Sequence, residues 1–357
     1  MRYDMKKIIA VFGTRPDAVK MCPLVLELKK RESLEVKVCL TGQHREMLDS
    51  VTDVFGVKAD YDLSVMGKAQ PLSEITTKII DGITPIFENE KPDLVLVHGD
   101  TATAFAAALA AFYLKIPVGH VEAGLRTHRI DSPYPEEFNR RAVSLISTLD
   151  FAPTEAAREN LVGEGKDPNR VFVTGNTVID ALNFTANNEK CDGKTVLLTA
   201  HRRENIGAGL ENIFSAARRI AEKYPDFDIV CPLHPNPAVR ATAEKLLGGV
   251  KNVNLCRPLD LREFHSLLAR SVIVMTDSGG VQEEAAALGK PTLVLREKTE
   301  RTEGGSLILV GTNEDDIVSA FDRLMTDSDY YASIKNTPSP FGDGNASRRI
   351  ADILERI

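Results

Sequence analysis

The sequence contains a series of short runs of aliphatic and β-branched residues that do not alternate with polar ones. Such runs are typical of strands that are buried on both faces of a parallel sheet. The predicted strands are 8–12, 36–41, 94–98, 118–122, 171–174, 196–199, 229–232, 253–256, 272–276 and 292–295, and predicted helices between them include 18–30, 73–89, 102–114 and 210–223. This alternation predicts an α/β protein with parallel sheets and helices on both faces of each sheet.

A length of 357 residues exceeds that of a typical single domain and favours two hydrophobic cores. The strand and helix alternation also starts again after Gly175, and the polar segment 183–193 is typical of an interdomain connection. We expect two Rossmann-like doubly wound domains that face each other across a cleft. The first covers 1–177 and receives a C-terminal helix at 344–357 that crosses back to it, and the second covers 178–343.

Composition and charge exclude several classes of protein. The formal charge of −7 argues against a general nucleic-acid binder. Five cysteines without Cys-x-x-Cys spacing indicate a reducing compartment, so we expect a cytoplasmic protein. No stretch approaches the roughly 20 apolar residues of a membrane span, and the seven histidines show no zinc-binding spacing. We therefore expect neither a membrane nor a metal as a partner.

The first predicted strand is followed by a turn with two cations. Gly13 opens the turn, Arg15 follows it, and Lys20 lies one helical turn into the next helix. Neither the three glycines of a dinucleotide fingerprint nor the Gly-Lys-Ser/Thr of a P-loop occurs there, so a nicotinamide enzyme is disfavoured and no cofactor is expected. Arg15 and Lys20 could bind a phosphate at the helix N-terminus, or they could be solvated charges beside a simple N-cap turn.

Three carboxylates follow predicted strands or begin the next helix. Asp100 follows the strand at 94–98, Glu122 ends the next strand, and Glu136 begins a helix after a proline-rich loop. Ligands of open parallel sheets bind beyond the carboxyl ends of the strands, so these acids could share a site and act as general acids or bases. Each could instead cap a helix or complement its dipole.

A histidine and two arginines follow a buried strand in the second half of the chain. They are His201, Arg202 and Arg203. The histidine could carry a proton or contact a phosphate, and the arginines could neutralise a diphosphate. The alternative is a structural histidine, which the flanking charges make less attractive.

The strongest local signal is the turn Ser278-Gly279-Gly280, which follows a buried strand and opens a helix that carries Glu284. The glycines let backbone N–H groups approach a diphosphate at the helix N-terminus. Glu284, one turn further on, could accept hydrogen bonds from two ribose hydroxyls. A plain strand-to-helix turn is the alternative.

Collinear motifs run over residues 10–301 and cover nearly the whole chain. They are VFGTRPDAVKMCPLV, GQHREML, VLVHGDT, PVGHVEAGLRT, SPYPEEFNR, GNTVIDAL, TAHRREN, TDSGGVQEEA, LGKPTLVLR and TER. With these motifs the chain resembles the non-hydrolysing UDP-N-acetylglucosamine 2-epimerases of bacteria and archaea. The resemblance implies the two-domain GT-B fold, a homodimer, and reversible conversion of UDP-N-acetylglucosamine into UDP-N-acetylmannosamine for the synthesis of cell-surface polysaccharide precursors.

The resemblance also implies a reaction and a set of residues. In this family UDP leaves C1 as C2 loses its proton, which gives 2-acetamidoglucal, and UDP then adds back as the other face of C2 is protonated. The implied catalytic residues are Asp100, Glu122, Glu136 and His201. The implied nucleotide-binding residues are Arg15, Lys20, Phe264, Ser278, Gly279, Gly280, Glu284 and Arg301, with Phe264 near uracil.

Some members of this family bind a second UDP-N-acetylglucosamine as an activator. The matching positions here are Gln43, Glu46, Ala69, Glu136, Arg202 and His234. Glu46 replaces a frequent Gln, and Ala69 replaces a frequent Arg. Because the Arg cation that would contact a diphosphate is missing, the sequence does not decide whether this protein is activated in the same way. In the first motif, Asp17 stands where Glu is usual, a change that we expect to be tolerated.

Four other functions are compatible with the same motifs. The first is a 2-epimerase of a modified UDP-diacetamido sugar, because the sequence does not define the C3 and C6 substituents. The second is a hydrolysing epimerase that releases free N-acetylmannosamine. A GT-B glycosyltransferase is the third, suggested by the Ser-Gly-Gly turn alone. A catalytically silent nucleotide-sugar sensor is the fourth.

Overall fold

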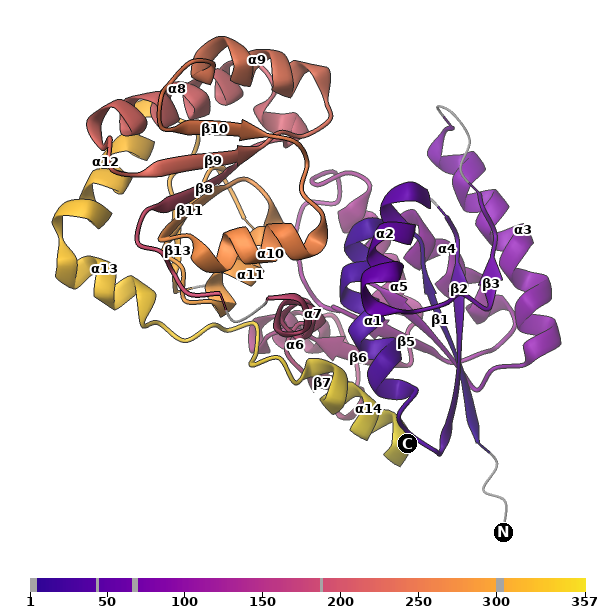
Figure 1. Cartoon of the computed structure of the whole chain (residues 1–357). Coiled ribbons are helices and arrows are strands. Elements are labelled where there is room, and N and C mark those ends of the chain that lie inside the picture. The colour runs from indigo at the N-terminus through magenta and orange to yellow at the C-terminus, as the bar shows by residue number, and fades with distance from the viewer. Residues whose placement is uncertain (1–4, 43–44, 66–69, 187–188, 300–304) are drawn as a thin grey trace. The chain divides into compact units, whose positions relative to one another are not determined.

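The structure is a computed structural model that describes residues 5–42, 45–65, 70–186, 189–299 and 305–357. The chain folds as two compact units (Figure 1). Unit 1 comprises Met1–Ala181 together with Gly342–Ile357, and unit 2 comprises Leu182–Phe341. The sequence alone places the two passages between domains at 177/178 and 343/344.

Unit 1 is built on a parallel sheet with the strand order β3-β2-β1-β4-β5-β6-β7. Its strands are β1 (Lys6–Phe12), β2 (Leu34–Leu40), β3 (Tyr61–Asp62), β4 (Leu94–His98), β5 (Val118–Val121), β6 (Leu149–Ala152) and β7 (Val171–Val173). Its helices are α1 (Arg15–Leu28), α2 (Arg45–Phe55), α3 (Leu72–Glu90), α4 (Ala102–Tyr113), α5 (Glu136–Ile146), α6 (Glu155–Gly163), η1 (Pro168–Arg170) and α14 (Ala346–Arg356), and α7 (Thr177–Thr185) continues into unit 2. The strand order reverses between β1 and β4, and the carboxyl ends at such a reversal are where doubly wound sheets bind ligands.

Unit 2 repeats this plan with the strand order β10-β9-β8-β11-β12-β13, again all parallel. Its strands are β8 (Thr195–Thr199), β9 (Asp228–Pro232), β10 (Val253–Cys256), β11 (Ile273–Thr276), β12 (Thr292–Val294) and β13 (Leu307–Leu309). Its helices are η2 (Arg203–Asn205), α8 (Ala208–Lys223), α9 (Pro237–Leu247), α10 (Leu261–Arg270), α11 (Gly279–Ala287), α12 (Glu314–Thr326) and α13 (Ser328–Lys335). Here the order reverses between β8 and β11.

Each sheet is covered by helices on both faces, which explains why most residues of its strands are apolar. In unit 2, α8, α9 and α12 cover one face and α10 and α11 the other (Figure 1). In unit 1, α3 contributes Ile83 and Phe87, α4 contributes Ala107 and α5 contributes Val143 to a core with β1, β4 and β5. Burial of these aliphatic surfaces supplies most of the folding free energy. Among the described residues, no helix has the length and apolarity needed to cross a bilayer.

The C-terminal helix α14 packs against α1 of unit 1. The carboxylate of Asp180 accepts hydrogen bonds from the backbone N–H groups of Ala346 (3.2 Å) and Ser347 (2.8 Å), and so holds the start of the helix. At the other end, Lys6 Nζ donates to the carbonyl of Leu354 (2.9 Å), and Arg31 pairs with Asp352 (2.9 Å). These contacts tie the last residues of the chain to its first strand and helix.

The prediction of a parallel α/β fold with two doubly wound sheets is confirmed. Every predicted strand coincides with an observed one, whereas β3, β6 and β13 are not predicted. β6 has the sequence LDFA, and Asp150 in its middle interrupts the apolar run that would predict a strand. In the fold this carboxylate is fully buried and pairs with Lys166 (3.0 Å) and the hydroxyl of Ser147 (2.7 Å).

Candidate active site

The turn after β1 places a cation at the switch point of the unit 1 sheet. Thr14 caps α1, and its hydroxyl accepts a hydrogen bond from the N–H of Asp17 (3.4 Å). Gly13 is required by close packing, because a Cβ there would lie 1.8 Å from Thr41 Oγ1. Arg15, which is half-buried, is the first residue of α1 and so lies at the helix N-terminus, as expected.

Lys20 and Glu122 form a buried ion pair at this edge. The Lys20 ammonium contacts Glu122 Oε2, and each side chain is 8% exposed. Asn176 Nδ2 donates to the same carboxylate oxygen (2.7 Å). Glu122 also adopts a φ of 61°, in the left-handed region that a non-glycine residue rarely occupies and that is often found at functional sites. The sequence predicts both charged residues as site residues, but it does not predict that they contact each other.

His98 is a buried histidine next to this pair. It ends β4 and is 4% exposed. Its Nδ1 lies 3.5 Å from Asp17 Oδ1, and its Nε2 lies 3.8 Å from Glu122 Oε2. Neither ring nitrogen has a hydrogen-bond partner among the described residues. The imidazole therefore lies between two carboxylates, one in the first turn of α1 and one in the loop after β5.

Asp100 follows β4 and is held by helix α5. Arg140 Nε donates to Asp100 Oδ2 (3.0 Å), Arg140 Nη2 contacts the same oxygen, and Asn139 Nδ2 donates to the Asp100 carbonyl (2.9 Å). Arg140 is itself anchored by the fully buried carboxylate of Glu137 (3.3 Å). A carboxylate held by a guanidinium in this way has a defined orientation.

Glu136 is the first residue of α5 and follows two cis peptide bonds, Ser132–Pro133 and Tyr134–Pro135. It is half-buried, and no hydrogen bond or ion pair engages its carboxylate within the part of the chain that the structure describes. Residues four apart in a helix share a face, so Glu136 lies on the same side of α5 as Arg140. Since Arg140 contacts Asp100, the two predicted acids lie at the same edge of the sheet.

In unit 2, His201 and Asp277 follow the two strands at the switch point. Asp277 is fully buried, and its Oδ2 accepts hydrogen bonds from the N–H groups of His201 and Arg202 (both 2.8 Å) and from Asn205 Nδ2 (3.0 Å). Its Oδ1 lies 3.6 Å from His201 Nδ1. The ring of His234 stacks on that of His201, with centroids 5.0 Å apart and an interplanar angle of 6°. Burial lowers the pKa of His201, and the charge of Asp277 opposes this shift.

The Ser278-Gly279-Gly280 turn leaves the N-terminus of α11 open. Ser278 is the N-cap residue but makes no side-chain cap hydrogen bond, and its N–H donates to Thr276 Oγ1 (3.0 Å). A Cβ placed on Gly280 would have no neighbour within 4 Å. The first N–H groups of a helix have no partner within the helix, so this terminus can receive an anion.

Glu284 lies one helical turn beyond Gly280 and is buried. Its Oε2 has no hydrogen-bond partner among the described residues, and it lies 3.6 Å from His265 Nε2. The half-buried Phe264 precedes His265 in α10, and their rings are 6.2 Å apart. Ser278, Gly279, Gly280, Glu284 and Phe264 all belong to unit 2. Arg301, together with Gln43 and Ala69 of the activator motif, lies outside the described residues.

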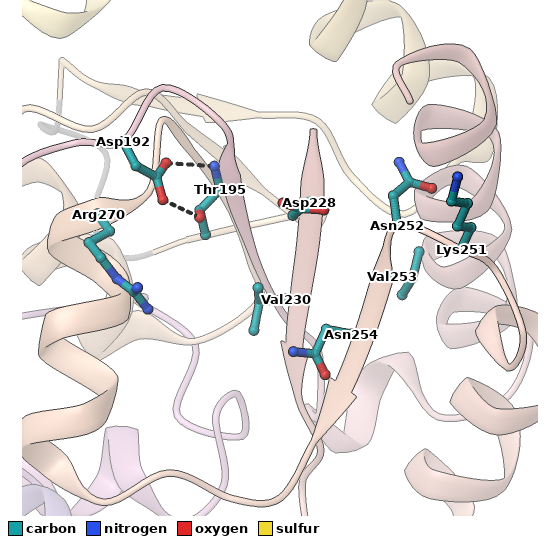
Figure 2. Close-up of a pocket in the computed structure, with 9 residues that line it drawn as sticks. All are labelled: Asp192, Thr195, Asp228, Val230, Lys251, Asn252, Val253, Asn254 and Arg270. Atoms are coloured by element: carbon teal, nitrogen blue, oxygen red, sulfur yellow. Dashed lines mark hydrogen bonds between the residues drawn. The ribbon is translucent and has the colours of Figure 1, made fainter. Parts of the chain in front are cut away.

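A pocket of about 350 Å³ lies elsewhere in unit 2, at the amino ends of its strands (Figure 2). Its polar groups already have structural roles: Asp192 accepts hydrogen bonds from the N–H and hydroxyl of Thr195 (2.8 and 2.6 Å), and Asn252 Nδ2 donates to the carbonyls of Ala221 and Phe227. The lining residues are Asp192, Thr195, Asp228, Val230, Lys251, Asn252, Val253, Asn254 and Arg270. This pocket is at the opposite end of the strands from His201 and Ser278, so we place the candidate site at the carboxyl ends. In the described ranges, no group of three or more His, Cys, Asp or Glu side chains could hold a metal ion.

Several residues that hold the predicted site residues in place are not evident from the sequence. Asn176 and Arg140 are remote in sequence from the acids that they contact, so no local pattern reveals them. Glu137 acts indirectly, because it anchors Arg140 three residues along the same helix. Asp277 and His98 are visible as polar residues at the ends of apolar strands. That signal could have identified them.

The two sheets and the residues at their carboxyl ends define a two-domain α/β enzyme with the GT-B fold. A family model described as UDP-N-acetylglucosamine 2-epimerase matches residues 26–355. The chain belongs to the UDP-N-acetylglucosamine 2-epimerase family, which confirms the resemblance found in the sequence.

Individual relatives cover nearly the whole chain. A UDP-N-acetylglucosamine 2-epimerase of Bacillus subtilis is 50% identical over 359 residues, with 98% of this chain and 94% of the relative covered. The crystal structure of the Neisseria meningitidis enzyme bound to UDP-GlcNAc has a TM-score of 0.93 at 48% identity and covers 98% of this chain and 100% of that one. The Methanocaldococcus jannaschii enzyme in complex with UDP-GlcNAc and UDP has a TM-score of 0.84 at 34% identity, with 98% and 100% covered.

Proposed function

We propose that this protein interconverts UDP-N-acetylglucosamine and UDP-N-acetylmannosamine by elimination of UDP and its re-addition. The observation that supports this most is the set of carboxylates at one sheet edge, Asp100, Glu122 and Glu136, in a chain 48% identical to an enzyme whose crystal structure holds UDP-GlcNAc. The same structural relative supports the nucleotide sugar as the substrate class.

The chemistry explains why several acids are needed. The proton on C2 has no neighbouring carbonyl, so its simple removal would leave an unstabilised carbanion. In the proposed reaction a base takes this proton, the C2–H electron pair forms the C1–C2 double bond, and UDP leaves with the C1–O electron pair. The reverse addition places a proton on the opposite face of C2. Groups on both faces of the ring must therefore exchange protons, and we assign Asp100, Glu122, Glu136 and His201 to this work.

The developing charge on UDP requires fixed positive partners. We assign the diphosphate to the open N-terminus of α11 at Ser278, Gly279 and Gly280, where the helix dipole and N–H groups stabilise an anion without a metal. Glu284, with an oxygen that has no hydrogen-bond partner among the described residues, is assigned to the ribose hydroxyls, and Phe264 to the uracil side. Arg15, Lys20 and Arg301 complete the proposed set of nucleotide-binding residues.

We further propose a homodimer. Support comes from helices α4 and α5, which pack side by side and expose large apolar side chains: Phe112, Tyr113, Phe138 and Leu145, the last 82% exposed. Such faces on neighbouring helices are typical of protein interfaces. Leu145→Glu is expected to convert dimers into monomers in sedimentation velocity, and unchanged dimers would contradict this assignment.

We propose that the enzyme works in the cytoplasm and supplies precursors of cell-surface polysaccharides. The free thiols of all five cysteines support a reducing compartment.

Product analysis tests the proposed reaction. The protein is incubated with UDP-N-acetylglucosamine alone, and the mixture is separated by ion-pair chromatography with mass detection. UDP-N-acetylmannosamine is expected as the product, in equilibrium with the substrate. Free N-acetylmannosamine with UDP would instead indicate a hydrolysing enzyme, and no conversion without an added acceptor would favour a glycosyltransferase.

A further inference from the structure

Asp277 has two carboxylate oxygens with very different surroundings. Oδ2 accepts three hydrogen bonds, from the N–H groups of His201 and Arg202 and from Asn205 Nδ2. Oδ1 is buried and has no hydrogen-bond partner within the described part of the chain. A buried acceptor without a partner costs free energy, so its retention calls for a physical reason.

Nδ1 of His201 lies close to that oxygen. The two atoms are 3.6 Å apart, which is slightly too long for a hydrogen bond but within the range that a small rotation of the imidazole closes. The backbone of His201 is held by the other oxygen of the same carboxylate (2.8 Å), so the ring and the acid cannot separate widely.

His201 faces three other titratable or charged groups, each from a different direction or element. They are Asp277 after β11, Arg202 in the same loop, and His234 after β9, whose ring stacks on that of His201. Burial lowers the pKa values of both His201 and His234, which favours their neutral forms. A neutral imidazole carries its proton on one nitrogen only, and its hydrogen-bond partner decides which one.

We propose that Asp277 is a positioning residue for His201: Oδ1 accepts a hydrogen bond from Nδ1–H, fixes this tautomer, and leaves Nε2 with its lone pair toward the substrate. Nε2 can then accept one proton to give an imidazolium, whose charge the aspartate stabilises, and return it later in the cycle. This inference deepens the proposed function, because it rests on His201 as a proton carrier.

The direct test is Asp277→Asn, examined first by a measurement that needs no activity. In ¹⁵N-labelled wild-type protein, long-range ¹H–¹⁵N correlation spectra are expected to show His201 as the Nδ1–H tautomer. In the variant, the tautomer population is expected to move toward Nε2–H, and the midpoint of His201 titration is expected to move to lower pH, because the charge that raises its pKa has been removed. The same tautomer and midpoint in both proteins would overturn the proposal.

Turnover supplies the second readout. Asp277→Asn is expected to lower kcat by about 10² to 10⁴-fold, the range for loss of a group that orients a catalytic residue. If Asp277 acts through His201, adding Asp277→Asn to a His201→Asn variant is expected to lower kcat by less than about a further threefold. The reason is that the effects of substitutions in residues that act as a unit are not additive. An equal loss in both backgrounds would indicate a purely structural role and overturn the proposal.

Asn205→Ala is the matched control, since it removes one donor to Asp277 but keeps the charge. It is expected to lower the midpoint of unfolding while the His201 tautomer stays as in the wild type. A tautomer shift as large as that of Asp277→Asn would overturn the proposal. Failure of this inference can be distinguished from failure of the proposed function. Full turnover in His201→Asn would remove His201 from the proposed mechanism, whereas the tautomer of His201 in the spectra tests only the role of Asp277.

Discussion

Lys20 and Glu122 lie 102 residues apart in the sequence and form an ion pair at the carboxyl edge of the first sheet, with both side chains almost fully buried. Each of the two charges depends on the other, because an uncompensated buried charge is costly. This relationship gives the site a rigid starting geometry before any substrate binds.

Lys20→Met is therefore expected to lower the free energy of unfolding by about 3 kcal/mol, as is typical when one partner of a buried pair is removed. Urea denaturation at pH 7 measures the change. Lys78→Met is the control, because Lys78 pairs with Glu74 (2.8 Å) on an exposed face of α3, where solvent screens the interaction. A loss for Lys20→Met no larger than that of the control would contradict the structural role of the pair.

Asp100→Asn tests the acid that Arg140 holds. The substitution keeps the shape of the side chain but removes its charge, so turnover is expected to fall by at least about 10²-fold, the low end of general acid–base contributions. UDP affinity, measured by calorimetry, is expected to stay within about threefold, since our proposed nucleotide site involves other residues. Asp315→Asn is the control, because it removes the charge of an exposed aspartate that pairs with Arg219 (2.7 Å) and lies in unit 2, outside the proposed site. Turnover of Asp100→Asn close to that of Asp315→Asn would remove Asp100 from the mechanism.

Gly280→Ala tests the anion site. The new methyl group meets no atom within 4 Å, and alanine favours helices, so the fold is expected to stay at least as stable. The same methyl group would occupy the space that a diphosphate needs at the N-terminus of α11, so UDP affinity is expected to fall about tenfold or more, roughly 1.4 kcal/mol. Gly163→Ala, also with open space and in helix α6, is expected to bind UDP normally. Equal affinities for the two variants would place the diphosphate elsewhere.

The buried His120 is expected to make the free energy of unfolding depend on pH. It is fully buried, its Nε2 lies 2.8 Å from the carbonyl of Gly99, and burial lowers its pKa from 6.5 to about 3. Between these two values the unfolded chain binds a proton that the folded protein does not, so the free energy of unfolding falls as the pH falls. This group contributes about 1.4 kcal/mol per pH unit within that window.

His120→Gln keeps a side chain that can donate to Gly99 but does not titrate. Urea denaturation between pH 7 and pH 4 is therefore expected to show a shallower pH dependence for the variant than for the wild type, whatever its stability at pH 7. Parallel curves would mean that His120 is not the source of the acid sensitivity.

The fold is predictable because its strands are buried on both faces and so appear as uninterrupted apolar runs. The exceptions are β3 and β13, which have only two and three residues, and β6, which carries Asp150. The charge of Asp150 is compensated by Lys166 and the hydroxyl of Ser147. Such compensation depends on tertiary contacts, so the sequence pattern does not show it.

The candidate site likewise contains residues that the sequence predicts and residues that only the fold reveals. Asp100, His201 and Ser278 are predictable because each lies two residues beyond the end of an apolar strand, and the parallel strands of a sheet have their carboxyl ends at one edge. Arg140 is not predictable, since the approach of α5 to the loop after β4 depends on helix packing between residues 40 positions apart. Likewise, nothing local indicates that the two oxygens of Asp277 have such different environments.

In the proposed reaction the substrate loses and regains the proton on C2 within this active site, so this position must exchange with solvent during turnover. UDP-N-acetylglucosamine is incubated with the protein in D₂O and followed by ¹H NMR. We predict UDP-N-acetylmannosamine with deuterium at C2, and with time deuterium at C2 of the starting sugar as well, since the reaction is reversible. Epimer formation with the C2 proton fully retained, or nucleotide release with C2 unlabelled, would contradict elimination and re-addition of UDP as the reaction.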